Sequence, residues 1–216
     1  MNKRSNGKMK YRMLSILGLV IFFGVWEAAV RLGWVSHRSL NAPSEVVETF
    51  IYKLTNANPD GSTLPQHFFQ SLKLALTSFI IATIIGVPLG WIMGYYKVAD
   101  FLLNPLFEII RPIPPIAWIP IVILTMGIGM SAKVFIIFVA ALPNVINSYL
   151  GIRLTDATLI NVAKTFGASD WKIFTTVCIP SSMNMVFTGI RLSLNASWTT
   201  LVAAEMLASI RGLGYM

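Results

Sequence analysis

Residues 72–94 read LKLALTSFIIATIIGVPLGWIMG, and this stretch decides the class of fold. Its single charge is Lys73, and the next charge along the chain is Lys97. A helix needs about 20 apolar residues to cross the ~30 Å hydrocarbon core of a bilayer, and this run is long enough. The stretch therefore predicts a helix that spans a membrane.

The rest of the chain repeats this pattern. Charge-free runs of similar length lie between Arg111 and Lys133 and between Lys133 and Arg153. Of the 216 residues, 55% are hydrophobic and 12% are charged. A soluble domain carries roughly 25% charged residues. A soluble helical protein would also need polar faces at helical spacing, and these runs have none. The sequence predicts an all-α, polytopic membrane protein.

We expect about five spans, near residues 13–32, 72–94, 111–129, 132–150 and 183–208. Four prolines in 112–120 predict an irregular start to the third span, after an interfacial helix at 100–110. Five Lys or Arg residues and no acid precede the first span, which places the N-terminus in the cytoplasm. A cleaved signal peptide is the alternative, but the first run contains Glu27 and has no small-residue cleavage site.

The predicted organisation has two parts. Residues 1–64 hold the basic segment, the first span and an extracytoplasmic loop, and residues 65–216 hold the transmembrane domain. The single cysteine, Cys178, excludes a disulfide framework. His37 and His67 both fall outside the predicted spans, and no metal-ligand spacing occurs, so we predict no metal, no cofactor and no intramembrane catalytic site.

Several polar or aromatic groups lie inside the predicted spans and are candidates for lining a transport pathway. Amides in a span also bond neighbouring helices, and charges near helix ends also extend to the interface, so both alternatives stay open. The two charged candidates, Arg191 and Glu205, lie about 21 Å apart along one helix and cannot pair with each other. The candidates are Trp118, Asn144, Asn147, Arg191, Asn195, Trp198 and Glu205.

Residues 156–180, DATLINVAKTFGASDWKIFTTVCIP, separate the fourth and fifth spans and should face the cytoplasm. The pattern predicts two short helices, with Gly167 supplying the positive φ that ends the first. Ser169 or Asp170 should cap the second helix, and Pro180 should close it before the next span. Apolar side chains on such a pair suit a protein partner, while an ordinary interfacial connector is the alternative.

This segment resembles the cytoplasmic "EAA" loop of membrane subunits of ATP-binding cassette (ABC) importers. That pattern is Glu-Ala-Ala, three residues, Gly, nine residues and Ile-x-Leu-Pro. Here Ala163, Gly167 and Pro180 match it at the right spacing, and Asn161 stands where the family has Glu. Four blocks are similar to the nitrate, sulfonate and taurine branch: RPIPPIAWIPIVILTMGIG, FGASDWKIFTTVCIPSS, TGIRLSLNASWTTLVAAEMLAS and GLGYM.

The resemblance implies a type I importer fold and a permease subunit rather than an enzyme. Its expected partners are cytoplasmic ABC ATPase subunits, an extracytoplasmic substrate-binding protein, a second copy of the permease and membrane lipid, in a bacterial cytoplasmic membrane. The implied solute is an aliphatic sulfonate, taurine or nitrate, with a pyrimidine or thiamine-precursor vitamin as the alternative. A passive channel or membrane scaffold is a further alternative.

The resemblance also implies where force enters. Within the coupling loop, at about residues 155–181, the residues expected to contact the ATPase are Ala163, Lys164, Phe166, Gly167, Ala168, Ser169, Trp171 and Pro180. Such permeases continue beyond the GLGY block with a further span, whereas this sequence stops at Met216, so the last span is expected to be missing.

Overall fold

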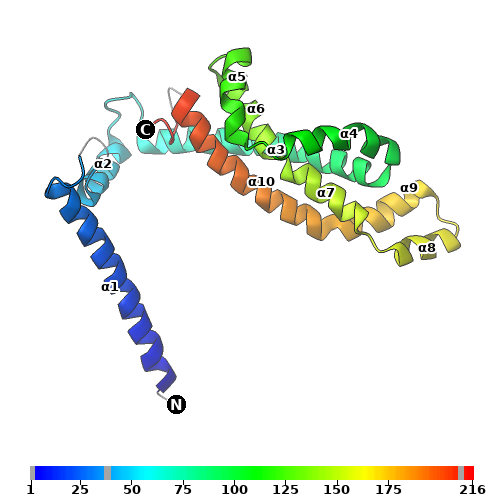
Figure 1. Ribbon diagram of the computed structural model, residues 1–216, viewed down its shortest axis with the longest axis horizontal. Helices are drawn as coiled ribbons and strands as arrows, with labels where there is room; N and C mark the ends of the chain where they lie inside the picture. Colours follow the sequence, from blue (N-terminus) through cyan, green and yellow to red (C-terminus); the bar gives the residue numbers. More distant parts are fainter. Residues whose placement is uncertain (1–2, 37–39, 209–211) are drawn as a thin grey trace. The chain divides into compact units, whose positions relative to one another are not determined.

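The computed structural model describes residues 3–36, 40–208 and 212–216, and every regular element in these ranges is helical (Figure 1). The chain divides into two compact units, Met1–Pro65 and Gln66–Met216. The all-α prediction is confirmed. His37, which the sequence placed outside the spans, lies outside the described residues.

The first unit contains α1 (Lys3–Arg31) and α2 (Pro43–Thr55). The large apolar side chains of α1 from Met9 to Val25 are exposed, as lipid contact requires, whereas Val30 near its end is buried. Glu27 near the end of α1 forms an ion pair with Arg31, and it accepts hydrogen bonds from the backbone N–H and the hydroxyl of Ser44. These contacts tie the start of α2 to the end of the first span.

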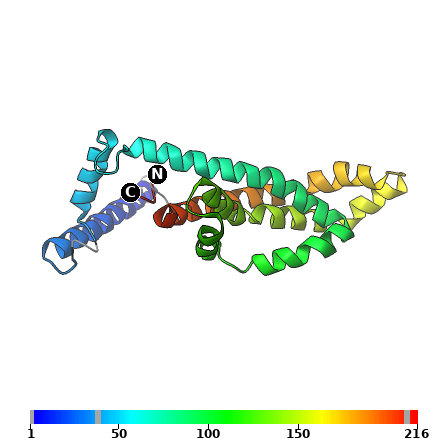
Figure 2. The same cartoon turned by 90° about the horizontal axis from the view of Figure 1, so that it is seen from above.

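The second unit begins at Gln66, within α3. The first two residues of this helix, Leu64 and Pro65, fall in the first unit. The two longest helices of the second unit are α3 and α10, and Figure 2 shows α7 alongside them. Its elements are α3 (Leu64–Tyr95), α4 (Lys97–Ile110), η1 (Pro115–Trp118), α5 (Ile119–Met126), α6 (Met130–Ala140), α7 (Pro143–Arg153), α8 (Ala157–Thr165), α9 (Asp170–Ile173), η2 (Phe174–Cys178) and α10 (Ile179–Ala208).

Glycines let α7 approach the two long helices closely. A Cβ built on Gly90 of α3 would lie 2.3 Å from the carbonyl oxygen of Val145 in α7. On the other side of α7, a Cβ on Gly151 would lie 2.8 Å from Cβ of Ser182 in α10. Small residues at helix contacts are the usual means of close packing in membranes. The absence of a side chain at Gly90 and Gly151 therefore serves helix packing.

The predicted spans agree with the helices in number, but their limits differ. Four helical stretches are long and apolar enough to cross a membrane in the described part of the chain: Met9–Arg31, Leu64–Tyr95, Met130–Arg153 and Asp170–Met206. A fifth forms if Lys97–Ile110 and Pro115–Met126 are counted together. The helix that contains the second span begins at Leu64, so His67 lies within this helix rather than in a loop before it.

Two spans are broken rather than straight. The pair Lys97–Ile110 and Pro115–Met126 is bent by 90°, at the prolines expected to disturb the third span. Proline lacks an N–H and clashes with the preceding helical turn, so a run of prolines cannot continue a helix. The fourth span is interrupted as well, because α6 ends at Ala140 and α7 starts at Pro143.

Candidate functional site

The segment at residues 155–181 folds locally much as its sequence predicts. Asp156 caps α8 by accepting a hydrogen bond from the backbone N–H of Thr158 at 2.8 Å, and this bond holds the pKa of the Asp156 carboxyl below its usual value. Gly167 ends the first helix with φ of +75°. The Ser169 hydroxyl accepts a bond from the backbone N–H of Lys172 at 3.4 Å and caps α9. The helix–glycine–helix prediction is confirmed.

Pro180 does not close the second short helix, and this part of the prediction is wrong. Helical structure continues without a gap from Asp170 to Met206. Residues Phe174–Cys178 form a wide π-helical turn directly before the proline. Such a turn accommodates the missing N–H and the bulk of the ring, which an α-helical turn would not. The part of the segment that starts at Asp170 is therefore continuous with the fifth span, while α8 is separated from it by the turn at Gly167.

An apolar cluster seats this segment on the rest of the second unit. Ile173, Phe174 and Cys178 are buried against Ile152 at the end of α7. The Tyr95 hydroxyl, at the end of α3, donates a hydrogen bond to the backbone carbonyl of Asp170 at 2.9 Å. The rings of Tyr95 and Phe174 lie 4.9 Å apart between centroids. The segment is thus fixed to the ends of α3 and α7.

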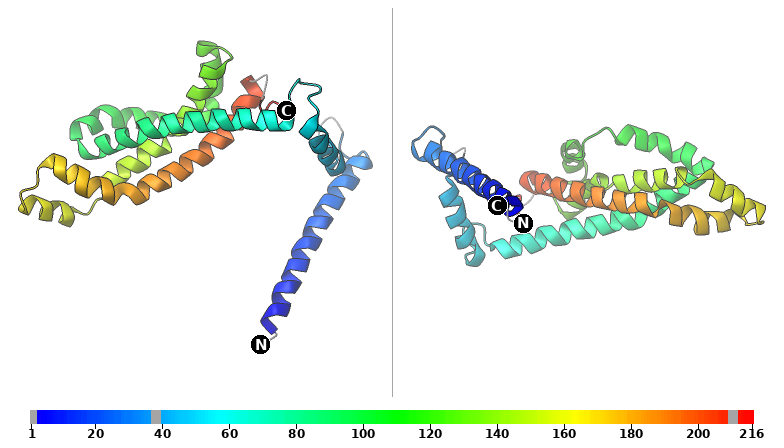
Figure 3. Two further views of the ribbon diagram at one scale, coloured as in Figure 1. Left: turned by 180° about the vertical axis from the view of Figure 1, so that it is seen from behind. Right: turned by 90° about the horizontal axis from the view of Figure 1, so that it is seen from below.

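Several apolar side chains of the segment stay exposed, whereas Ile160, Val177 and Ile179 pack against the buried cluster. Phe166 is 86% exposed and Trp171 is 65% exposed, and they flank the open turn at Gly167. A Cβ on Gly167 would meet nothing within 4 Å. Figures 1 and 3 show α8 and α9 at one end of the second unit, with the C-terminus at the other end. Of the remaining predicted coupling residues, Ala163 and Ala168 are half-buried, and Lys164, Ser169 and Pro180 are exposed.

Of the two amides of the fourth span, Asn144 bonds a neighbouring helix and Asn147 bonds its own. Asn144 is fully buried and donates a hydrogen bond to the hydroxyl of Thr83 in α3 at 2.9 Å. Asn147 is half-buried and donates to the backbone carbonyl of Pro143 at 2.9 Å. Trp118 is half-buried against the core cluster around Ile119. These contacts favour the helix-bonding alternative for Asn144.

The candidates on α10 fall into two groups. Arg191 and Asn195 are exposed, and they belong to an exposed polar stripe whose members share one side of the helix, within an arc of about 80° at 3.6 residues per turn. Sequence analysis missed the other members, although the helical period could have found them. The polar stripe consists of Asn184, Thr188, Arg191, Asn195 and Thr199.

Trp198 and Glu205 differ from the polar stripe. Trp198 is half-buried and packs on a core cluster with Leu74 and Leu201. Glu205 is only 1% exposed and lies within hydrogen-bonding distance of the Ser71 hydroxyl. Extension of Glu205 to the membrane interface, one of the two alternatives for this residue, does not occur. The structure therefore does not gather all seven pathway candidates into one place.

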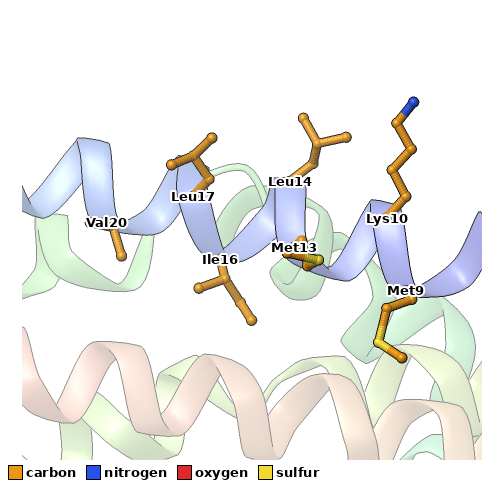
Figure 4. Close-up of a pocket in the computed structure, with 7 residues that line it drawn as sticks. All are labelled: Met9, Lys10, Met13, Leu14, Ile16, Leu17 and Val20. Atoms are coloured by element: carbon orange, nitrogen blue, oxygen red, sulfur yellow. The ribbon is translucent and has the colours of Figure 1, made fainter.

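A hollow along α1 contributes nothing to these sites. Seven residues line it, and all belong to α1 (Figure 4). A hollow between the side chains of one helix is not an enclosed ligand cavity, because ligand sites are formed where several elements converge. An apolar cavity of about 240 Å³ lies instead between α3, α4, η1, α6 and α7, with Gly86, Phe107 and Trp118 in its lining.

Comparison with known proteins decides the family. Residues 86–216 match the binding-protein-dependent transport system inner membrane component family. The chain belongs to this family. A relative from Brucella melitensis, named as a probable ABC transporter permease protein, is 36% identical over 97% of this chain and 82% of its own length. The permease is therefore a membrane-embedded ABC transporter subunit, and a separate ATPase subunit hydrolyses ATP for it.

Two further relatives of the permease carry named solutes. The taurine transport system permease protein TauC of Escherichia coli is 34% identical over 94% of this chain and 74% of its own length. The bicarbonate transport system permease protein CmpB of Synechococcus elongatus is 30% identical over 98% of this chain and 80% of its own length. The family works with a binding protein, so an ATPase and a substrate-binding protein are the partners of this permease.

Proposed function

We propose that the 155–181 segment is the surface through which the ATPase drives this permease. The observation that carries the proposal is the exposure of Phe166 and Trp171 beside the open turn at Gly167. Large aromatic side chains that flank a small residue suit insertion into a cleft of a partner. The coupling residues of the family pattern, Ala163 to Trp171, occupy this surface.

The proposed movement is a rigid-body tilt. Because helical structure is continuous from Asp170 to Met206, a push on α9 moves α10 directly. The hydrogen bond from Tyr95 to Asp170 and the packing of Phe174 carry the same movement to α3. Rigid-body motion of packed helices is a common form of alternating access. We therefore propose that closure of the ATPase pair tilts α3 and α10 together.

The Gly167→Asp variant tests this proposal. The new side chain has room within the chain, but it places a charge at the centre of the proposed contact. We expect normal membrane insertion and loss of at least tenfold in the amount of ATPase that co-purifies with the permease, since burial of an unpaired charge costs well over ~1.4 kcal/mol. Co-purification at the wild-type yield would refute the proposal.

Gly167→Asn is the matched control for that experiment. Asparagine is nearly the same size as aspartate, and it also tolerates the positive φ of +75° at this position. A larger loss for Asp than for Asn therefore reports the charge rather than the backbone. Equal losses would point to strain in the turn instead.

We also propose that the solute is a small oxyanion, with taurine and related aliphatic sulfonates first. The relatives with named solutes act on taurine and bicarbonate, both of which carry charged oxygens. The polar stripe of α10 supports this proposal, because exposed polar groups inside a span are costly in lipid and acceptable beside water. Arg191 in the stripe supplies a positive charge and bidentate donors.

Uptake into proteoliposomes tests the solute. We expect the permease, assembled with its ATPase and binding protein, to accumulate labelled taurine only with internal ATP, and Arg191→Gln to reduce uptake by tenfold or more. Thr77→Ala is the control, since Thr77 is exposed on α3 and bonds only its own helix, to the carbonyl of Lys73. Uptake of bicarbonate but not taurine would contradict the sulfonate assignment.

The remaining proposals concern assembly. We propose a homodimer, since two permease copies complete the pathway of a type I importer. We also propose that the N-terminus is cytoplasmic and that residues 65–216 act as the transmembrane domain. The five basic residues before the first span support this orientation.

A further inference from the structure

A buried polar cluster lies at the end of the second unit opposite to the 155–181 segment, where α3 starts and α10 ends. His67 and Ser71 of α3 are 1% and 0% exposed, and Glu205 of α10 is 1% exposed. None of these side chains belongs to the coupling surface or to the polar stripe. The sequence separates Ser71 from Glu205 by 134 residues, so only the fold brings them together.

Each of the three side chains accepts a hydrogen bond from the C-terminal turn. The backbone N–H of Gly212 donates to Nδ1 of His67 at 2.9 Å, and that of Leu213 donates to Oγ of Ser71 at 2.9 Å. The backbone N–H of Gly214 donates to Oε2 of Glu205 at 3.0 Å. Three successive N–H groups are thus bound by three side chains from two helices. Only the N–H of Gly214 reaches the carboxylate, and the other two N–H groups are satisfied by the imidazole and the hydroxyl.

The hydroxyl of Ser71 joins the two helices within this cluster. It lies 2.7 Å and 2.8 Å from the two carboxylate oxygens of Glu205 and donates a hydrogen bond to the carboxylate. Because Nδ1 of His67 accepts a bond, the ring carries its proton on Nε2. Lys133 of α6 is 8% exposed and interacts electrostatically with Glu205, so the buried carboxylate has a cationic neighbour.

The turn requires glycine at two positions to reach these groups. A Cβ on Gly212 would lie 2.3 Å from the carboxyl carbon of Glu205, and the φ of Gly212 is +137°, which other residues rarely adopt. A Cβ on Gly214 would lie 2.4 Å from the carbonyl oxygen of Val202. The two glycines therefore let the backbone approach the carboxylate closely.

We infer that His67, Ser71 and Glu205 form a clasp, which holds residues 212–214 and makes these ends of α3 and α10 move as one body throughout transport. Glu205 is then a positioning residue rather than a group that contacts the solute. A buried carboxylate with several donors is costly to expose and costly to leave unpaired, so the clasp resists opening. The role of the clasp rests on the proposed movement of α3 and α10 by the ATPase. It is the same whichever solute the permease carries.

Amide exchange in the assembled complex tests whether the clasp exists. In Glu205→Gln we expect the amides of residues 212–214 to exchange on the order of tenfold faster, since a bond to a charged acceptor is stronger than one to a neutral acceptor. Ser71→Ala is the second variant, with the same expectation, in case the first does not fold. Thr77→Ala on the same helix is the control and should exchange as wild type does. Wild-type protection in both clasp variants would overturn the inference.

A disulfide tests whether the clasp stays closed. The backbone N–H of Leu213 bonds the hydroxyl of Ser71, so cysteines introduced by Ser71→Cys and Leu213→Cys are close enough to form a disulfide. The native cysteine is removed by Cys178→Ala. We expect the oxidised pair to keep the ATP hydrolysis rate of the assembled complex within twofold of wild type, and to restore slow amide exchange to Glu205→Gln.

Two results would contradict a clasp that stays closed. Loss of ATP hydrolysis on oxidation, recovered on reduction, would show that the helix ends must separate during the cycle. Failure of the disulfide to restore slow exchange would show that Glu205 acts in another way. Neither readout requires the solute, so a wrong taurine assignment would leave this test intact.

Discussion

At the scale of single residues, glycine has three different uses in this permease. At Gly167 it supplies a positive φ in an open turn, where any side chain would have room. At Gly90 it removes a side chain from a helix contact, in ordinary helical backbone. At Gly212 it does both, because the turn is left-handed and a carboxylate lies against it. The same residue type therefore predicts different effects of substitution.

Gly90→Ala tests the second use. The new Cβ would lie 2.3 Å from the Val145 carbonyl oxygen, so α3 and α7 must move apart. We expect a loss of about 1–3 kcal/mol of stability, the range for overpacked interiors, and a lower thermal midpoint in detergent. Gly18→Ala in α1 is the control, since nothing lies within 4 Å of its Cβ. Equal midpoints for the two variants would contradict the close contact.

At the scale of elements, proline has opposite outcomes at two places. Pro112, Pro114 and Pro115 lie where α4 ends and the chain bends by 90°. Pro180 is instead accommodated within a continuous helix, by the wide turn at Phe174–Cys178. The difference is mechanical, because several adjacent prolines remove several backbone donors, while one proline removes one and needs space for one ring. The second outcome joins the proposed coupling surface to the fifth span.

At the scale of the whole molecule, the orientation in the membrane links the proposals. The 155–181 segment and the clasp lie at opposite ends of the second unit (Figure 3). If the N-terminus is cytoplasmic, counting spans places the segment inside the cell and the clasp near the outer surface. The ATPase would then act at one end of α3 and α10, and the clasp would hold the other end together.

Cysteine labelling tests this orientation. We expect Ser169→Cys to react with an impermeant maleimide only after cells are opened, and Asn58→Cys to react in intact cells. Both positions are exposed, and the native Cys178 is buried, so its background should be low. Labelling of Ser169→Cys in intact cells would reverse the orientation and leave the coupling segment without access to a cytoplasmic ATPase.

The sequence by itself determined the features that depend on neighbours along the chain. These include the apolar spans, a cap at Ser169 or Asp170 and the positive φ of Gly167. Span length follows from the thickness of the bilayer, and caps and turns follow from local hydrogen bonds, so a short window contains the necessary information.

Only the tertiary structure decided which distant groups meet. It continued the helix through Pro180, placed Asn144 against Thr83 and enclosed Glu205 with Ser71 and the C-terminal turn. A buried polar group must find a partner, but its sequence does not say which one, because many helices present serine, threonine or amide groups at similar spacing. Packing of α7 between glycines of α3 and α10 fixed the helix positions and, with them, the partners.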